Sequence, residues 1–206
     1  MDVLVLETEP NAADKVVDQL TDRGHRVSRC HSTERPAFPC RALEGQRPCP
    51  LADPGIDVAV TVRVNPGTLP SLGEDGVACA LRARVPLVVA GRATVNPYED
   101  WADDVVEDGD VAGACERVVT APVRSHTHVA QLALRDALRR RAGSASGAEA
   151  AVWRDRRGLK VQLDGLDDLD QSVRGLVAAE VAAALRDFDA HTSRIDISFG
   201  ETDRHV

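Results

Sequence analysis

Three cysteines and one histidine stand close together in the first half of the chain: Cys30, His31, Cys40 and Cys49. Three thiolates and one imidazole form a standard tetrahedral environment for zinc, and an iron-sulfur cluster is a less favoured alternative. The spacing differs from that of a zinc knuckle, and the adjacent Cys30 and His31 can both ligate only if the strand has already turned. We therefore predict a metal site at these four residues, with zinc as the first choice.

The segment that carries these residues has no helical periodicity, and prolines occur at positions 36, 39, 48, 50 and 54. A connection of this length without secondary structure is uncommon in a compact domain and is usually functional or tied down. A bound metal ion would hold it in place. Two alternatives to a metal stay open: reduced thiols that pack as small apolar groups, and a redox-labile disulfide between Cys40 and Cys49.

The remaining reactive side chains fit simpler roles. His126 and His128 supply only two imidazoles, too few for a metal site, and Thr127 between them suits the N-cap of a helix. Cys79 and Cys115 fall inside two predicted helices, where we expect them to pack in the core. The chain contains no nucleophile elbow, phosphate loop or dinucleotide fingerprint, so an enzyme is the less favoured class.

The composition of the chain is typical of a folded globular protein. Of its 206 residues, 43% are hydrophobic and 28% are charged. The formal net charge of -8 disfavours nucleic acid as a partner. No apolar run is long enough to cross a bilayer, and no basic signal region opens the chain, so we expect a cytoplasmic protein without membrane contact.

Strand and helix patterns alternate along the first half. We predict strands over residues 3–6, 25–30, 56–62, 85–90 and 105–106, helices over residues 72–84 and 110–119, and a helical turn over residues 98–102. A further helix has apolar positions from Ala13 to Leu20 and ends at Gly24. Asn11 and Asp110 are the expected N-caps of the first and last helices. The alternation implies an α/β fold of the flavodoxin-like type, a doubly wound parallel sheet of five strands with helices on both faces.

A change of composition after residue 120 indicates a second domain. Residues 121–128 contain Pro122 and several polar residues and are predicted to form a linker. We then predict a helix over residues 127–141, a hairpin of strands 150–153 and 159–163, an amphipathic helix over 173–188 and a strand over 195–199. The expected domains are therefore residues 1–120 and a small α+β domain at residues 129–206.

Two segments of the first half match the sequence pattern of a known family: residues 3–11 (VLVLETEPN) and residues 57–67 (DVAVTVRVNPG). The first segment matches the opening strand and acidic cluster of the receiver domains of bacterial response regulators. The second matches the third strand, phosphoacceptor position and Pro-Gly turn of the same domains. The first half therefore resembles a receiver domain, and this resemblance implies the flavodoxin-like fold with a site at the carboxyl ends of the strands.

Carried over residue by residue, the resemblance argues against phosphorylation. Residues unsuited to phosphoryl transfer stand at three family positions: Val62 at the phosphoacceptor, Gly91 at the hydroxyl residue, and Glu107 or Asp108 near the lysine. Glu7 and Glu9 have the chemistry to hold magnesium, but we favour solvated acids that help to cap the next helix. We therefore predict a degenerate pseudo-receiver.

The favoured hypothesis is a non-catalytic cytoplasmic regulatory or adaptor protein that binds a protein partner. It joins the pseudo-receiver to a cysteine- and proline-rich loop over residues 30–55 that binds zinc. Alternatives are a redox or metal sensor and an enzyme with metal or thiol chemistry at the carboxyl end of the sheet. A transcription regulator is a further class, but the sequence offers no recognition helix for it.

The C-terminal elements loosely resemble ferredoxin-like dimerisation modules and the alkaline-shock-protein family in their order of hairpin, helix and final strand. The open sheet that this order produces leaves an edge strand at residues 195–199. An edge strand needs cover, and a symmetric dimer provides it. We therefore expect a homodimer through the C-terminal domain.

Overall fold

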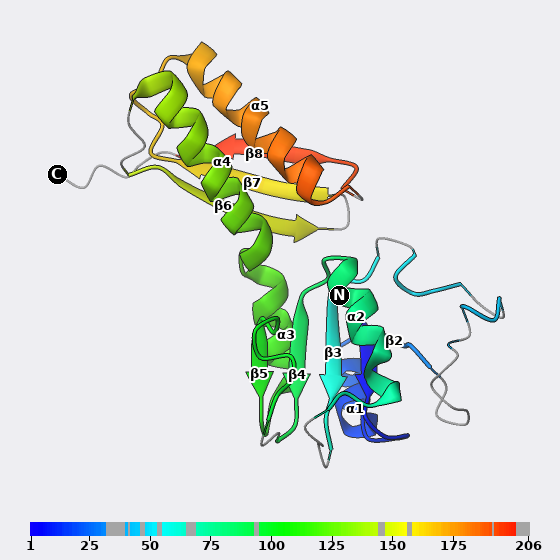
Figure 1. Ribbon diagram of the computed structural model, residues 1–206. Coiled ribbons are helices and arrows are strands. Elements are labelled where there is room, and N and C mark those ends of the chain that lie inside the picture. The colour runs from blue at the N-terminus through cyan, green and yellow to red at the C-terminus, as the bar shows by residue number, and fades with distance from the viewer. Residues whose placement is uncertain are drawn as a thin grey trace. The chain divides into compact units, whose positions relative to one another are not determined.

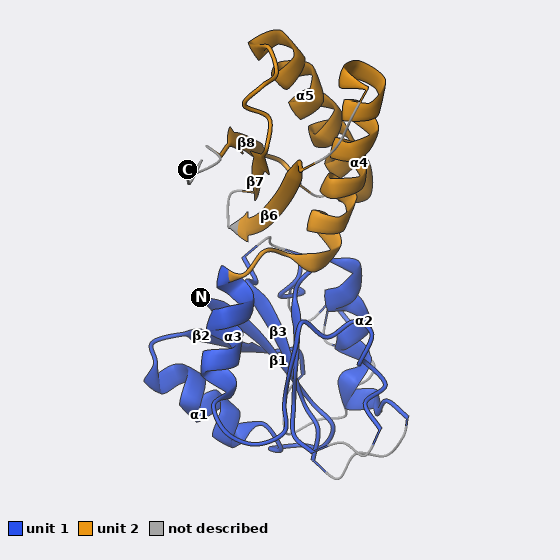
Figure 2. Cartoon of the chain, turned by 90° about the vertical axis from the view of Figure 1, so that its left-hand side faces the viewer, with its two compact units in different colours: residues 1–120 blue, residues 121–206 orange. Residues whose placement is uncertain are grey.

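The computed structural model describes residues 1–31, 40, 42–45, 48–52, 55–64, 69–92, 95–143, 147–155, 158–190 and 192–200. The chain divides into two compact units, residues 1–120 and residues 121–206 (Figure 2). Each unit has its own sheet and its own hydrophobic core. In the part of the chain that the structure describes, no helix is both long and apolar enough to cross a membrane.

The first unit is built on five parallel strands. These are β1 (Asp2–Glu7), β2 (Arg26–Arg29), β3 (Val58–Val62), β4 (Leu87–Ala90) and β5 (Asp104–Val106), arranged in the order β2-β1-β3-β4-β5 (Figure 1). This order is that of the flavodoxin-like fold, so the predicted fold class is confirmed. The central strands β1, β3 and β4 are buried almost throughout, which explains their nearly continuous apolar sequences.

The two faces of this sheet are covered differently. The helices α1 (Asp14–Asp22) and α3 (Val111–Thr120) lie on one side, and α2 (Asp75–Arg82) lies on the other (Figure 2). A short 3-10 helix, η1 (Leu72–Glu74), leads into α2. On the α2 side, the core is completed by residues from connecting segments, among them Leu51, Ile56 and Tyr98. Between β2 and β3, the described residues form turns and no helix.

The second unit is a small α+β fold. It contains α4 (Arg124–Ala142), β6 (Glu149–Asp155), β7 (Gly158–Asp164), α5 (Gln171–Phe188) and β8 (Ile195–Phe199). The strand order is β6-β7-β8, with β6 antiparallel and β8 parallel to β7. Both helices lie on the same side of the sheet and bury a core of Leu, Val and Ala (Figure 1). The predicted order of elements in this unit is confirmed.

Of the three predicted N-cap residues, one is correct and two are wrong. Asp110 caps α3, and the Gly113 N–H, followed by the Arg23 guanidinium, lowers the pKa of its carboxyl. Asn11 does not cap α1, because it adopts a φ of 69° and the helix begins later, at Asp14. The α4 helix begins at Arg124, so most of the predicted linker is helical.

Thr127 lies inside α4 and does not act as its N-cap. Val123 holds the N-cap position, without a capping side chain. The Thr127 hydroxyl instead accepts a hydrogen bond from the N–H of Val152 at 3.1 Å. The predicted cap therefore turns out to be a link between α4 and β6.

Candidate functional site at the carboxyl end of the first sheet

The ends of β1, β3 and β4 form one row. The strand register places Glu7 beside Val62 and Val62 beside Ala90. In doubly wound folds, ligands bind just outside the carboxyl ends of the strands, so this row is where a site is expected. Val62 is 5% exposed and packs in the core on the α1 and α3 side. Its side chain has no group that can accept a phosphoryl group.

Glu7 is a buried carboxylate with two partners from its own chain. Its Oε2 accepts a hydrogen bond from the N–H of Ala13 at 3.0 Å, next to the start of α1. Its Oε1 accepts a hydrogen bond from Nη1 of Arg29 at 2.9 Å. The other terminal nitrogen of Arg29 contacts the exposed Asp14 carboxylate. Arg29 therefore places a positive charge between two carboxylates.

Arg63, which follows Val62, is a buried cation. Its Nε lies 2.9 Å from Oε1 of Glu74, and neither side chain is exposed to solvent. The Thr61 hydroxyl donates to the same Oε1 at 3.3 Å, and the Ser71 N–H donates to Oε2 at 2.9 Å. These hydrogen bonds satisfy both oxygens of the buried Glu74 carboxylate, whereas Nε of Arg63 contacts Glu74 as an ion pair without hydrogen-bond geometry.

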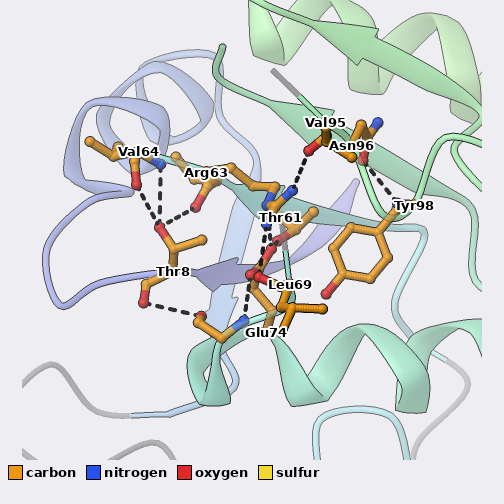
Figure 3. A network of polar contacts seen from close by, with 11 residues as sticks. Thr8, Thr61, Arg63, Val64, Leu69, Glu74, Val95, Asn96 and Tyr98 are labelled. Atoms are coloured by element: carbon orange, nitrogen blue, oxygen red, sulfur yellow. Dashed lines mark hydrogen bonds and ion pairs between the residues drawn. The ribbon is translucent and has the colours of Figure 1, made fainter. Parts of the chain in front are cut away.

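The guanidinium of Arg63 also holds the two loops that follow β3 and β4 (Figure 3). It donates hydrogen bonds to the carbonyl of Leu69 at 3.4 Å and to that of Val95 at 3.2 Å. Its Cζ lies 5.7 Å from the centroid of the Tyr98 ring. Burial, together with the Glu74 carboxylate, raises the pKa of Tyr98 to about 12, so the phenol stays neutral. Arg63 thus connects two loops that are distant in sequence.

Further hydrogen bonds join the end of β1 to the same region. Ser71 is the N-cap of η1, and its hydroxyl donates to the carbonyl of Thr8 at 3.2 Å. The Thr8 hydroxyl accepts a hydrogen bond from the N–H of Val64 at 3.2 Å, as Figure 3 shows. Together with the pairing of Glu74 and Arg63, these contacts fix η1 against the ends of β1 and β3.

Two glycines leave no room for side chains at this end of the sheet. A Cβ on Gly91 would lie 2.2 Å from the carbonyl oxygen of Arg63, and the φ of Gly91 is 107°. A Cβ on Gly73 would lie 2.1 Å from the carbonyl oxygen of Glu7. The hydroxyl-bearing residue that the receiver resemblance implies at position 91 therefore does not fit this backbone.

An acid stands near the position of the receiver lysine. Asp108 accepts a hydrogen bond from Nε of Arg92 at 2.8 Å, and both side chains are well exposed. Among the described residues, the carboxyl end of the sheet therefore includes an alkyl group at Val62, two arginines paired with glutamates, and the surface acid Asp108.

The four predicted metal ligands lie in different surroundings. Cys30 is half-buried and packs against α2, where Gly76 leaves room for its Sγ, and His31 is 8% exposed. Cys40 and Cys49 are half-buried. No group of three or more His, Cys, Asp and Glu side chains is placed to hold a metal ion among the described residues. Because residues 32–39, 41, 46–47 and 53–54 of this loop lie outside that part, the zinc site stays a prediction.

None of the five cysteines forms a disulfide in this structure, so the alternative disulfide between Cys40 and Cys49 is not formed here. Cys115 is buried as predicted, and burial raises the pKa of its thiol to about 12. The prediction for Cys79 is wrong, since this residue is exposed. The buried positions of α2 are Gly76, Val77 and Ala80, which leaves Cys79 on the solvent side of the helix.

The two histidines at the start of α4, His126 and His128, differ in their exposure to solvent. His128 is exposed, whereas His126 is fully buried and its Nε2 lies 3.0 Å from Oδ2 of Asp189. Phe188 packs edge-on against the His126 ring, with the ring centroids 5.2 Å apart. Burial alone would raise the pKa of Asp189, but hydrogen bonds from His126 and Thr192 and the charge of Arg154 outweigh it and lower that pKa. His126 therefore joins α4 to the end of α5.

Comparisons with known proteins do not assign this chain to a family. No protein family model matches it, and no curated protein matches it. Among solved structures, it is similar to the response regulator protein TrrA from Thermotoga maritima in complex with Mg²⁺-BeF. The TM-score is 0.36 and the sequence identity 15%, over 56% of this chain and 93% of that chain. The fold assignment rests on the strand order of the first unit.

Proposed function

We propose that this chain is a non-catalytic regulatory or adaptor protein whose receiver-like unit works without phosphorylation, by binding a protein partner. The observation that carries the proposal is the position of Val62 at the end of β3, in the row that joins Glu7 and Ala90. The receiver resemblance gives this position to the phosphoacceptor, and an alkyl side chain cannot form an acyl phosphate.

The charges around Val62 support the same proposal. Glu7 already pairs with Arg29 and with the N–H of Ala13. A magnesium ion at Glu7 would have to displace an internal cation and disturb the start of α1. The resident guanidinium therefore takes the place of a metal.

The loops around the site support a fixed conformation. Arg63 holds the loops after β3 and β4 through Leu69 and Val95, and its charge is balanced in the interior by Glu74. A buried pair of this kind resists rearrangement because separating it would leave an uncompensated charge. In this proposal, the unit offers one constant surface and does not switch with phosphate.

The test is incubation of the full chain with acetyl phosphate and magnesium, followed by intact-mass measurement. A phosphorylatable receiver domain treated in parallel is the positive control. We expect the mass of this chain to stay unchanged while the control gains a phosphoryl group. Stable phosphorylation of this chain at any residue of the first unit would overturn the proposal.

Zinc binding by the loop is a separate part of the proposal. Three thiols and one imidazole in a single connection support it, and so does the turn of the chain directly after β2, which the adjacent Cys30 and His31 require. We expect one equivalent of zinc in protein purified without a tag, lost in Cys40→Ser and retained in Cys79→Ser, whose exposed thiol lies on α2. Metal-free wild-type protein would refute this part alone.

Partners and location follow from the same proposal. A protein partner, a homodimer through the second unit and a cytoplasmic location are the expectations that a regulatory role carries. The loop would act as a structural element or as a reporter of metal or redox state. Protease sensitivity of residues 31–55 that changes on chelation would favour the reporter.

A further inference from the structure

The two edges of the three-stranded sheet in the second unit differ sharply. At the β6 edge, the backbone is occupied by α4 and the residue before it. The Val152 carbonyl accepts the N–H of Val123 at 2.6 Å, and the Val152 N–H donates to Thr127. Oε1 of Gln131 accepts a hydrogen bond from the Ala150 N–H at 2.7 Å, and its Nε2 donates one to the Ala148 carbonyl at 2.9 Å. This edge is therefore closed to another strand.

The β8 edge is built differently. Arg194 and Gly200 bond to β7, because the Arg194 carbonyl accepts from Leu159 at 2.9 Å and the Gly200 N–H donates to Leu163 at 3.0 Å. Backbone groups alternate along a strand, so the N–H and C=O groups of Ile195, Ile197 and Phe199 point away from β7. Within the described residues, these outward groups have no hydrogen-bond partner.

The residues of β8 do not protect this edge. Natural edge strands are usually blunted by Pro, by Lys, by a bulge or by an inward charge. The sequence IDISF of β8 has none of these, and its single charge, Asp196, points to the open face of the sheet. On the helix side, Ile195 and Ile197 are only partly buried and Phe199 is 42% exposed. The edge thus combines unpaired backbone with apolar side chains.

We propose that β8 pairs antiparallel with β8 of a second copy of this chain, with the two-fold axis at Ile197. Full overlap of the five-residue strand with itself occurs only in this register. It places Ile197 opposite Ile197, Ile195 opposite Phe199 and Asp196 opposite Ser198. All three outward-facing residues then fall at hydrogen-bonded positions.

The side chains suit this register. Cross-strand pairs of aromatic and β-branched residues stabilise a sheet, and Ile195 faces Phe199 twice by symmetry. No like charges oppose each other, because Asp196 faces an uncharged serine. A shift of the axis to Asp196 would bring two carboxylates together and is disfavoured. Self-complementarity of the strand therefore selects a second copy as the occupant. Dimerisation through β8 does not depend on whether the first unit accepts phosphate.

The test is the mass of the full chain in solution, by light scattering over a wide range of concentration. We expect a dimer of twice the 22.1 kDa chain mass. The amide N–H of Ile197 should exchange with solvent more slowly as the dimer forms. A chain that stays monomeric up to its solubility limit would overturn the proposal.

Two substitutions at one exposed residue test the register. Ser198→Asp opposes a carboxylate to Asp196 at two symmetric positions, and we expect it to weaken the dimer about 2- to 30-fold. Ser198→Lys opposes a cation to the same carboxylate and should dimerise at least as tightly as wild type. Circular dichroism confirms that both variants fold.

Two outcomes of this pair would count against the register. A dimer that is indifferent to Ser198→Asp does not use the register with its axis at Ile197. A dimer that Ser198→Lys weakens has its axis at Ser198, where two lysines would meet. Either result would overturn the proposed pairing of β8 with its copy.

Discussion

The first unit contains two arginine–glutamate pairs near the same end of its sheet, and they are built differently. Arg63 and Glu74 are both completely buried, and they form hydrogen bonds with backbone atoms of two segments, the one before η1 and the one after β4. Arg29 is 23% exposed and bridges the buried Glu7 to the exposed Asp14. The first pair belongs to the interior, and the second lies at an opening to solvent.

The difference separates structural support from replacement of a ligand. A buried pair whose other partners are loop carbonyls serves to hold those loops. A partly exposed guanidinium between two carboxylates occupies a position that a hydrated cation can also reach. We therefore expect loss of the buried pair to affect stability most, and loss of Arg29 to change ion binding.

The largest effect is expected for Glu74→Gln. The change leaves the Arg63 charge buried without its carboxylate, and we expect the free energy of unfolding to fall by about 3–5 kcal/mol. Urea denaturation measures the loss. Glu99→Gln, at an exposed position of the same unit, is the control and should stay within about 0.5 kcal/mol of wild type.

The double variant Arg63→Met/Glu74→Leu sharpens this result. Apolar replacement of a whole buried ion pair is often neutral, so it should be clearly more stable than Glu74→Gln. If the single and double variants lose the same free energy of unfolding, the penalty does not come from an isolated buried charge, and the interpretation of Arg63 and Glu74 as a supporting ion pair is wrong.

Asp189 in the second unit is a third buried carboxylate for comparison. We expect Asp189→Asn to lower the free energy of unfolding by about 1.5–3 kcal/mol. Its pKa is lowered in the folded chain, so its contribution is present above the unfolded pKa of about 3.9 and is lost as the pH falls below it. Unfolding measured between neutral and acid pH should show a flatter pH profile for Asp189→Asn. Identical profiles would contradict the assigned role.

For Arg29→Met, we expect the free energy of unfolding to fall by only about 1–2 kcal/mol, because the Ala13 N–H still donates a hydrogen bond to Glu7. The informative result is a gain: magnesium should raise the melting temperature of this variant and leave wild type unchanged. Arg26→Met, on the same strand and beside Asp2, is the matched control. If magnesium does not raise the melting temperature of Arg29→Met, the guanidinium of Arg29 does not occupy a cation site.

Much of the fold was predictable because its signals are local. The continuous apolar run of residues 58–62 predicts a strand buried on both faces. The alternation of apolar and polar residues over 159–163 predicts a strand buried on one face. The assignment of Val62 to the phosphoacceptor position rests on the Pro66-Gly67 pair of the sequence. Helix starts were less predictable, since the true N-caps of α1 and α4, Ala13 and Val123, carry no capping side chain.

The charge pairs were missed because their partners are distant in sequence. Arg29 reaches Glu7 only through the pairing of β2 with β1, which places Arg29 beside Val5. One signal was readable: Ser71 and Glu74 have the spacing of a capping box, which marks a helix start after β3. It gives no hint that Glu74 also neutralises Arg63, since that pairing requires the tertiary fold.

The smallest effect is expected for Arg92→Ala, which removes the partner of Asp108. Both side chains are well exposed, and isolated surface pairs contribute about 0–1 kcal/mol. We therefore expect a change in unfolding free energy of less than about 0.5 kcal/mol that disappears at high salt. Urea denaturation at two salt concentrations checks both points. A larger, salt-independent loss would mean that this end of the sheet depends on Asp108, and the division between buried support and exposed charge would have to be redrawn.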